Sequence, residues 1–191
     1  MRKLQMSDVQ SIEEYEKRRP IMRRQIIELK QIRRVALGEN ISVLFENRDT
    51  ALWQTLEMLR TERITQPDRI QDELDTYNEL VPEANELRAT LFIELPDTAN
   101  IPRDLPRFIG VEEAISLRFG GHTIQAEAEP GRSTEEKTAT VHYLRFPFTP
   151  EQVQTFGQGN TILAVDHKSC QAQTELSEAT IDSLKADLTS P

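Results

Sequence analysis

Residues 44–64, LFENRDTALWQTLEMLRTERI, run from the end of a strand-like segment through a polar corner into the most strongly patterned helix of the chain. Before the corner, β-branched and aromatic residues alternate with others over 41–45, which is typical of a buried strand. The corner offers Asn47 and Asp49, either of which can cap a helix by accepting a backbone N–H. The stretch therefore predicts a strand followed directly by a helix over 50–63.

The charges of this helix depart from an ordinary amphipathic pattern. Leu52, Leu56 and Leu59 line one side of it, because they recur at i, i+4 and i+7. Arg63 falls within that stripe, and Arg60 lies beside it. An unpaired buried guanidinium costs several kcal/mol, so the helix is expected to gather carboxylates around it.

We therefore predict a polar network between this helix and the next one, which begins at Pro67. Its members are three arginines and three acids: Glu46, Arg48, Glu57, Arg60, Arg63 and Glu73. The arginines at the end of the helix are expected to pair with Glu57 and Glu73. Three interpretations remain open, namely a structural salt-bridge network, a pocket that recognises an anion or a carboxylate, and a carboxylate metal site.

The same stretch is one of several that resemble an uncharacterised bacterial family, domain of unknown function 3501. The others are EEYEKRRP (13–20), DELDTYNELVP (72–82), ELRATLFIEL (86–95), EPGRS (129–133) and VHYLRF (141–146), so the resemblance covers nearly the whole chain. It implies a protein of similar length with no established activity. It also implies a redox enzyme, rubrerythrin-like or iron–sulfur, as a partner. The chain departs from the family pattern at VDHKSC (165–170), where a Pro and an aromatic residue are expected after the His.

The composition indicates an ordinary globular protein in a reducing compartment. The 191 residues fit a single domain over 1–191, with a mainly helical half over 1–86 and a mainly β half over 87–191. The single cysteine cannot form an internal disulfide, which favours the cytoplasm. No apolar run approaches the roughly 18 residues that a membrane span needs, and the N-terminus has no apolar signal region.

The net charge of −9 is unevenly distributed. Residues 1–38 have a balance of +5 and the remainder a balance of −14. The basic segment can bind an acidic partner or nucleic acid, or it can fold back onto the acidic body. The sequence pI near 5.0 and the scarcity of aromatic residues among the basic ones disfavour nucleic acid.

Helical signals precede strand signals along the chain. Ser11 and Glu14 form a capping box that predicts a short helix from Ile12, ended by Pro20, and a second helix is predicted over 20–35. Later, strands are expected over 87–95, 115–119, 123–128, 138–148, 161–165 and 170–175, with a short helix over 150–156 and a terminal helix capped by Ser177. We predict an α+β fold in which N-terminal helices pack on a largely antiparallel C-terminal β-sheet, with a short terminal helix.

Two further groups of residues are weaker candidates for chemistry. Arg132 and Ser133 lie in a Gly-containing turn able to hold a phosphate or carboxylate, although such loops are usually solvated. Asp166, His167 and Cys170 are three metal-ligand types within one turn, although an ordinary hairpin is the simpler interpretation. No phosphate-binding loop or nucleophile motif is present, and no cofactor is predicted.

These observations favour a non-catalytic cytoplasmic accessory or protein-interaction protein, whose partner is another protein, with self-association left open. The alternative is an enzyme or a sensor of a small anion or carboxylate. Its polar pocket would lie at the helix–sheet junction and be built from Arg48, Glu57, Arg60 and Glu73.

Overall fold

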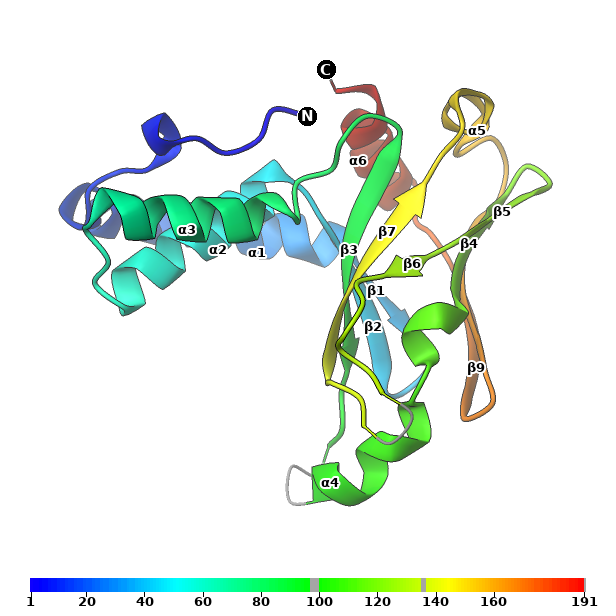
Figure 1. The fold of residues 1–191 in the computed structure, drawn as a ribbon. Helices are drawn as coiled ribbons and strands as arrows, with labels where there is room; N and C mark the ends of the chain where they lie inside the picture. Colours follow the sequence, from blue (N-terminus) through cyan, green and yellow to red (C-terminus); the bar gives the residue numbers. More distant parts are fainter. Residues whose placement is uncertain (97–99, 135–136, 191) are drawn as a thin grey trace.

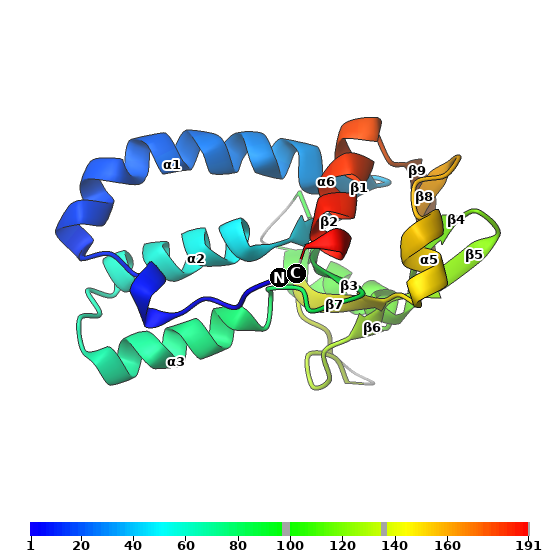
Figure 2. The ribbon, with the colours of Figure 1, turned by 90° about the horizontal axis from the view of Figure 1, so that it is seen from above.

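A computed structural model describes residues 1–96, 100–134 and 137–190, which form a helical arm and a β body (Figure 1). The arm contains the 3-10 turn η1 (Met6–Asp8) and the helices α1 (Ile12–Arg33), α2 (Arg48–Thr61) and α3 (Pro67–Asn78). The three long helices lie side by side and project away from the sheets, as two views at right angles show (Figures 1 and 2).

The β body consists of two antiparallel sheets, which confirms the predicted α+β class. Sheet A has the order β1 (Arg34–Leu37), β2 (Ile41–Glu46), β3 (Glu86–Ile93), β7 (Val141–Pro147) and β6 (Glu127–Ala128). Sheet B has the order β5 (His122–Gln125), β4 (Ile115–Phe119), β8 (Thr161–His167) and β9 (Cys170–Glu175). The remaining helical segments are α4 (Ile101–Asp104), η3 (Leu105–Phe108), η4 (Val111–Ala114), α5 (Pro150–Thr155) and α6 (Glu178–Thr189).

The alternation of side chains along β3 decides which residues reach the junction between arm and body. Leu87, Ala89 and Leu91 belong to the core between the two sheets. Since successive side chains point to opposite faces of a strand, Arg88 lies on the outer face of sheet A. A second apolar cluster, formed by the arm and including Leu74, packs near this outer face.

The prediction that the first helix ends at Pro20 is wrong, because α1 runs through Pro20 without a break. Pro20 is exposed, so the carbonyl that lacks its N–H partner can be solvated. The predicted end of the second helix, at residue 35, is also late. The chain turns at Arg34 into β1, an edge strand that pairs with β2 through a turn at Gly38, whose φ of +70° suits glycine.

The C-terminal half forms strands as predicted, but they divide between two sheets. The strand predicted over 123–128 splits at Ala126, so that β5 pairs with β4 in sheet B and β6 pairs with β7 in sheet A. Between β3 and β4 the chain forms α4, η3 and η4, and residues 97–99 of this connection lie outside the described part. Within the described ranges, no helix has both the length and the apolarity needed to cross a membrane.

Candidate functional site

Glu57 on α2 is the centre of a polar cluster that joins α2 to α1. Its carboxylate accepts the hydroxyl of Tyr15 at 2.7 Å and two N–H groups of Arg19, at 2.7 and 2.9 Å. Arg60, one turn further along α2, donates to the same carboxylate at 3.3 and 3.5 Å and lies 3.6 Å from Glu16. The cluster is therefore a clamp between helices that are far apart in sequence.

The clamp fixes the protonation of its carboxylate. The guanidinium of Arg19, with smaller contributions from Tyr15 and Arg60, lowers the pKa of Glu57 to about 2, although partial burial opposes this. Burial, followed by the hydrogen bond to Glu57, raises the pKa of the Tyr15 phenol. Near neutral pH the Glu57 carboxylate therefore stays ionised and the Tyr15 hydroxyl stays protonated, which suits a structural role.

The structure corrects the predicted geometry of this network. Glu57 and Arg60 come together, but their partners lie on α1 and not on α3. Arg63 lies beyond the end of α2 with a φ of 52°, where it is exposed and forms no ion pair with any described residue. Glu73 on α3 likewise forms no ion pair within the described ranges. The arginine in the leucine stripe reaches water at the helix end, which the sequence spacing could not distinguish from pairing.

Replacing Glu57 by glutamine should destabilise the protein by about 1–3 kcal/mol at neutral pH, because hydrogen bonds to a charged group are lost. The folded pKa of about 2 is below the ordinary value of 4.5, so the stabilisation is complete above pH 4.5 and disappears as the pH falls towards 2. Urea unfolding of both proteins across this range should show the difference shrinking. Glu62→Gln, at an exposed acid just past the same helix, is the control. A difference that stays constant down to pH 2 would contradict this account.

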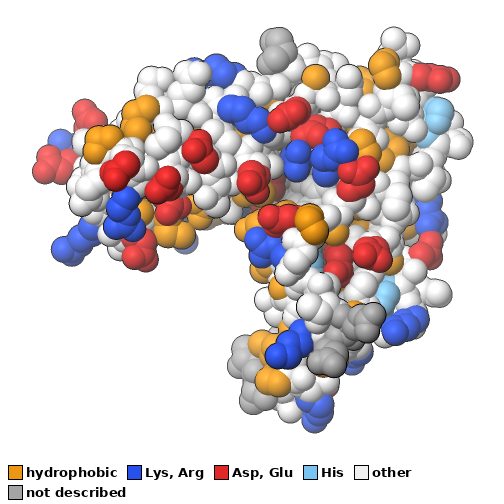
Figure 3. All heavy atoms as spheres, in the orientation of Figure 1, with side chains coloured by type: hydrophobic (Ala, Val, Ile, Leu, Met, Phe, Trp, Pro, Cys, Tyr) orange, Lys and Arg blue, Asp and Glu red, His pale blue; other side chains and the backbone are white. Residues whose placement is uncertain are grey.

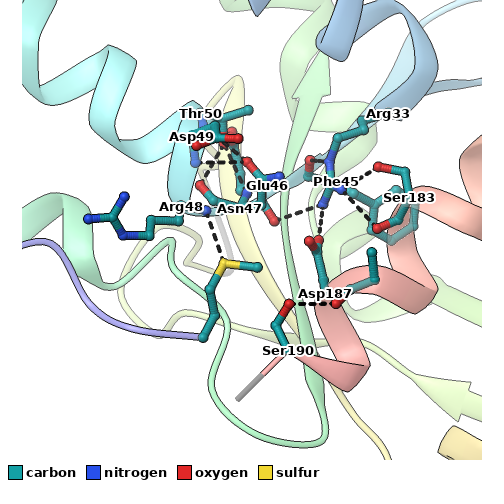
Figure 4. Close-up of polar contacts among 12 residues, drawn as sticks. Arg33, Phe45, Glu46, Asn47, Arg48, Asp49, Thr50, Ser183, Asp187 and Ser190 are labelled. Carbon is teal, nitrogen blue, oxygen red and sulfur yellow. Dashed lines mark hydrogen bonds and ion pairs between the residues drawn. The ribbon is translucent and has the colours of Figure 1, made fainter.

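Arg33, at the end of α1, occupies the most buried charged position among the described residues, with 0% of its surface exposed. Figure 4 shows its guanidinium between β2 and α6, where it pairs with the Asp187 carboxylate. It also donates to the Phe45 carbonyl at 2.7 Å, the Glu46 carbonyl at 3.1 Å and the Ser183 hydroxyl at 2.8 Å. Because all the acceptors are supplied by the fold, this buried pair fastens the C-terminal helix to the first strand pair.

Two of the predicted network residues, Glu46 and Arg48, lie next to this pair, but their side chains contact other residues. The buried carboxylate of Glu46 accepts the hydroxyl of Thr90 at 2.7 Å. Arg48 forms an ion pair with Asp8 at 2.6 Å. The backbone N–H of Arg48 donates to the sulfur of Met1 at 3.4 Å (Figure 4). These contacts tie the N-terminal segment to the start of α2, and they leave Arg48 about 13 Å along the helix from Glu57.

The turn between β8 and β9 does not assemble the candidate metal ligands. Asp166 pairs with Arg118 on the neighbouring strand. The ring of His167 donates from Nε2 to the Ile109 carbonyl at 3.0 Å and accepts at Nδ1 from the Ser169 N–H at 3.3 Å, so neither nitrogen is free. Burial raises the pKa of the Cys170 thiol. Over the described residues, no group of three or more His, Cys, Asp and Glu could hold a metal ion.

The predicted anion-loop residue Arg132 instead lies in the wall of a cleft. The cleft has a volume of about 430 Å³ and lies between the end of α3 and the outer face of sheet A. Its charged and aromatic lining residues are Tyr77, Glu79, Arg88, Glu127, Glu129, Arg132, Tyr143 and Arg145. Figure 3 shows acidic and basic side chains gathered where the helical arm meets the β body. Ser133 bonds to the hydroxyl of Thr138 at 2.8 Å and is not part of this lining.

The buried carboxylate of Glu86 organises the floor of the cleft. It accepts the Glu83 N–H at 3.0 Å, Nε of Arg88 at 2.7 Å and Nη1 of Arg145 at 3.2 Å. Burial alone would raise the pKa of Glu86, but these three donors outweigh it and hold the pKa below its ordinary value. This group was not predicted from the sequence, although the spacing of Glu86 and Arg88 in ELRATLFIEL places both on one face of the strand.

The large hydrophobic side chains that are exposed lie on the N-terminal segment and α1. In the described ranges these are Met6, Ile21, Ile27 and Ile32, with exposed fractions of 39, 56, 42 and 39%. Ile21 and Ile32 lie on the same side of α1, since eleven residues correspond to three helical turns. We call the side defined by these two isoleucines the outer face of α1.

Comparisons with known proteins place this architecture among proteins without an assigned activity. A family model described as "Protein of unknown function (DUF3501)" matches residues 3–188. The chain is also similar to a solved structure described as a novel protein of unknown function from Burkholderia pseudomallei K96243. The two share 32% sequence identity and superpose with a TM-score of 0.91, covering 98% of this chain and 100% of that one. A search of curated proteins gave no match.

Proposed function

We propose that this chain, which belongs to the DUF3501 family, is a cytoplasmic, non-catalytic accessory protein that binds another protein through the outer face of α1. The observation that carries the proposal is the placement of the exposed isoleucines. Over the described residues, the large exposed hydrophobic side chains are confined to residues 6–32. Two of them, Ile21 and Ile32, share one face of a projecting helix, and apolar side chains exposed on one helix face are a feature of protein-binding surfaces.

The charges around the outer face indicate the chemistry of the partner. Lys17, Arg18 and Arg24 are exposed around this face and form no ion pair with any described residue, and one exposed acid, Glu28, lies between the two isoleucines. A partner with apolar side chains surrounded by carboxylates would complement this surface. Part of the basic segment does pack on the rest of the chain, since Lys3, Arg19, Arg33 and Arg34 pair with Glu83, Glu57, Asp187 and Glu94.

The family resemblance supports a redox enzyme as the class of partner, and this remains a prediction. The alternative pocket built from Arg48, Glu57, Arg60 and Glu73 has less support. Arg48 pairs with Asp8 at the opposite end of α2 from Arg60, so these four side chains do not converge.

The double substitution Ile21→Glu with Ile32→Glu should weaken partner binding at least tenfold while leaving the fold intact, because both side chains are exposed. The tagged protein would first capture its partner from cytosol, and mass spectrometry would identify it. Calorimetry with the purified partner then measures the affinity of each variant. Gln31→Glu adds one charge to another exposed position of α1 and is the matched control.

Two results would count against the proposal. One is unchanged affinity of the double variant for the purified partner. The other is an equal loss with Gln31→Glu, which would show a general charge effect. Light scattering addresses self-association, because a dimer that the double variant converts to a monomer would identify the partner as a second copy of the chain.

A further inference from the structure

Two arginines in the cleft between α3 and sheet A present unused hydrogen-bond donors. Arg88 is anchored through Nε to Glu86 at 2.7 Å, and Arg132 through Nε to Glu129 at 2.8 Å. The terminal nitrogens of both side chains donate to no described residue. Each guanidinium is thus fixed in position while its terminal fork stays available, which is the geometry that binds carboxylates and phosphates in a bidentate manner.

Arg145 differs from these two arginines. It donates from Nε and Nη2 to Glu127, at 3.0 and 2.6 Å, and from Nη1 to Glu86 at 3.2 Å. All three nitrogens are therefore engaged, and burial of the Glu86 carboxylate keeps the arrangement in place. Arg145 supports the floor of the cleft and is not offered to a ligand.

Aromatic rings supply the apolar part of the cleft. The Arg132 guanidinium stacks over the Tyr143 ring, with 4.2 Å between its central carbon and the ring centroid. Tyr77 on α3 contributes a second ring to the lining. A volume of about 430 Å³ lies within the range of about 300–1,000 Å³ that small-molecule pockets occupy, so the space suits a compact ligand.

The acidic side chains of the lining indicate which charged groups the ligand has. Glu127 and Glu129 are neutralised by Arg145 and Arg132. Glu79, at the end of α3, is exposed on the rim, and its carboxylate has no ion pair or hydrogen bond among the described residues. A simple polyanion would meet this free carboxylate, whereas a ligand that also has a cationic group would pair with it.

We propose that the cleft binds a small zwitterion of the amino-acid class. Its carboxylate lies on the terminal nitrogens of Arg88 and Arg132, and its ammonium group faces Glu79. Its side chain packs against the rings of Tyr77 and Tyr143. The site is separate from the outer face of α1, so the result of testing one proposal does not decide the other.

The test uses the full chain and the standard free L-amino acids. Thermal unfolding is followed with each amino acid at millimolar concentration, and with the matching acid that lacks the amino group, such as phenylpropionate for phenylalanine. Compounds that raise the midpoint are titrated by calorimetry against the wild type and three variants, Arg88→Gln, Arg132→Gln and Glu79→Gln. Arg118→Gln, at a similarly exposed and ion-paired arginine on sheet B, is the control.

We expect at least one amino acid to bind saturably, with affinity about tenfold or more lower in each arginine variant, because a charge-assisted fork is lost. Glu79→Gln should weaken the amino acid but not its deaminated counterpart. Absence of any stabilising amino acid would overturn the proposal. So would equal binding of the deaminated acid, or an equal loss with Arg118→Gln. Circular dichroism checks the folding of each variant, and Glu79→Gln, at an exposed rim position, remains decisive if Arg88→Gln unfolds.

Discussion

Replacing Asp187 by alanine should lower the free energy of unfolding by about 3–5 kcal/mol, because it leaves the guanidinium of Arg33 buried without an anion. Arg33 is 0% exposed and Asp187 5% exposed, so water cannot replace the lost carboxylate without opening the contact between α6 and β2. The carbonyls of Phe45 and Glu46 would still accept hydrogen bonds but would not neutralise the charge. Urea unfolding at neutral pH measures the loss.

A double substitution separates the cost of an unpaired charge from the value of the pair. Burial raises the pKa of Asp187, although Arg33 opposes this, so desolvation of the carboxylate is a cost that the pairing has to offset. Arg33→Met with Asp187→Leu should therefore be less destabilising than Asp187→Ala alone. Asp182→Ala, at an exposed acid on the same helix, is the control and should change stability by less than about 0.5 kcal/mol. A double variant that is the least stable of the set would show that the ion pair itself stabilises the fold.

Local signals in the sequence predicted the elements that they cap or pattern. The Ser11 box, the Asn47 cap and the Ser177 cap each mark the start of a helix in the structure. The strand before Asn47 and the strand over 115–119 also lie where the sequence predicted them. These features depend on residues two to four positions apart, which a single sequence displays directly.

Features that depend on tertiary packing could not be predicted from the sequence in the same way. Pro20 was expected to end a helix, but α1 tolerates it on the solvent side because packing through Tyr15 and Ile26 holds both flanks. The same error hid the clamp, since a broken α1 would not align Tyr15 and Arg19 with α2. Glu57 was identified from its place on α2, but its partners depend on how two helices dock.

The cleft illustrates the other limit. Its arginines come from β3, β7 and the turn after β6, and only the strand order of sheet A brings them together. Arg132 was singled out for its turn composition, whereas Arg88 and Arg145 appeared as ordinary strand residues. Their cross-strand register, with Arg88 opposite Arg145, is the missing information.

Replacing Tyr15 by alanine should destabilise the protein by about 3–5 kcal/mol, since it removes a buried aromatic ring and leaves a cavity. Tyr15 is 1% exposed, and its ring meets Trp53 edge-on with centroids 6.1 Å apart. Tyr15→Phe keeps the ring and removes only the hydroxyl bound to Glu57, so it should cost about 1–2 kcal/mol. Ile21→Ala, at a side chain that is 56% exposed, should be close to neutral.

Hydrogen exchange can show where the loss in Tyr15→Ala occurs. Tyr15, Glu16 and Arg19 join the first half of α1 to α2. The amides of that half should therefore exchange faster in Tyr15→Ala than those of β3, which lies in the core between the sheets. Equal acceleration in α1 and β3 would instead mean that arm and body unfold together.

Equal destabilisation by Tyr15→Phe and Tyr15→Ala would assign the clamp's energy to the hydroxyl and not to the ring. If the larger loss comes from Tyr15→Ala, the stability of α1 depends mainly on the packing of the Tyr15 ring against Trp53. Tyr15→Ala should then also weaken partner binding, because the partner would have to order α1 on binding.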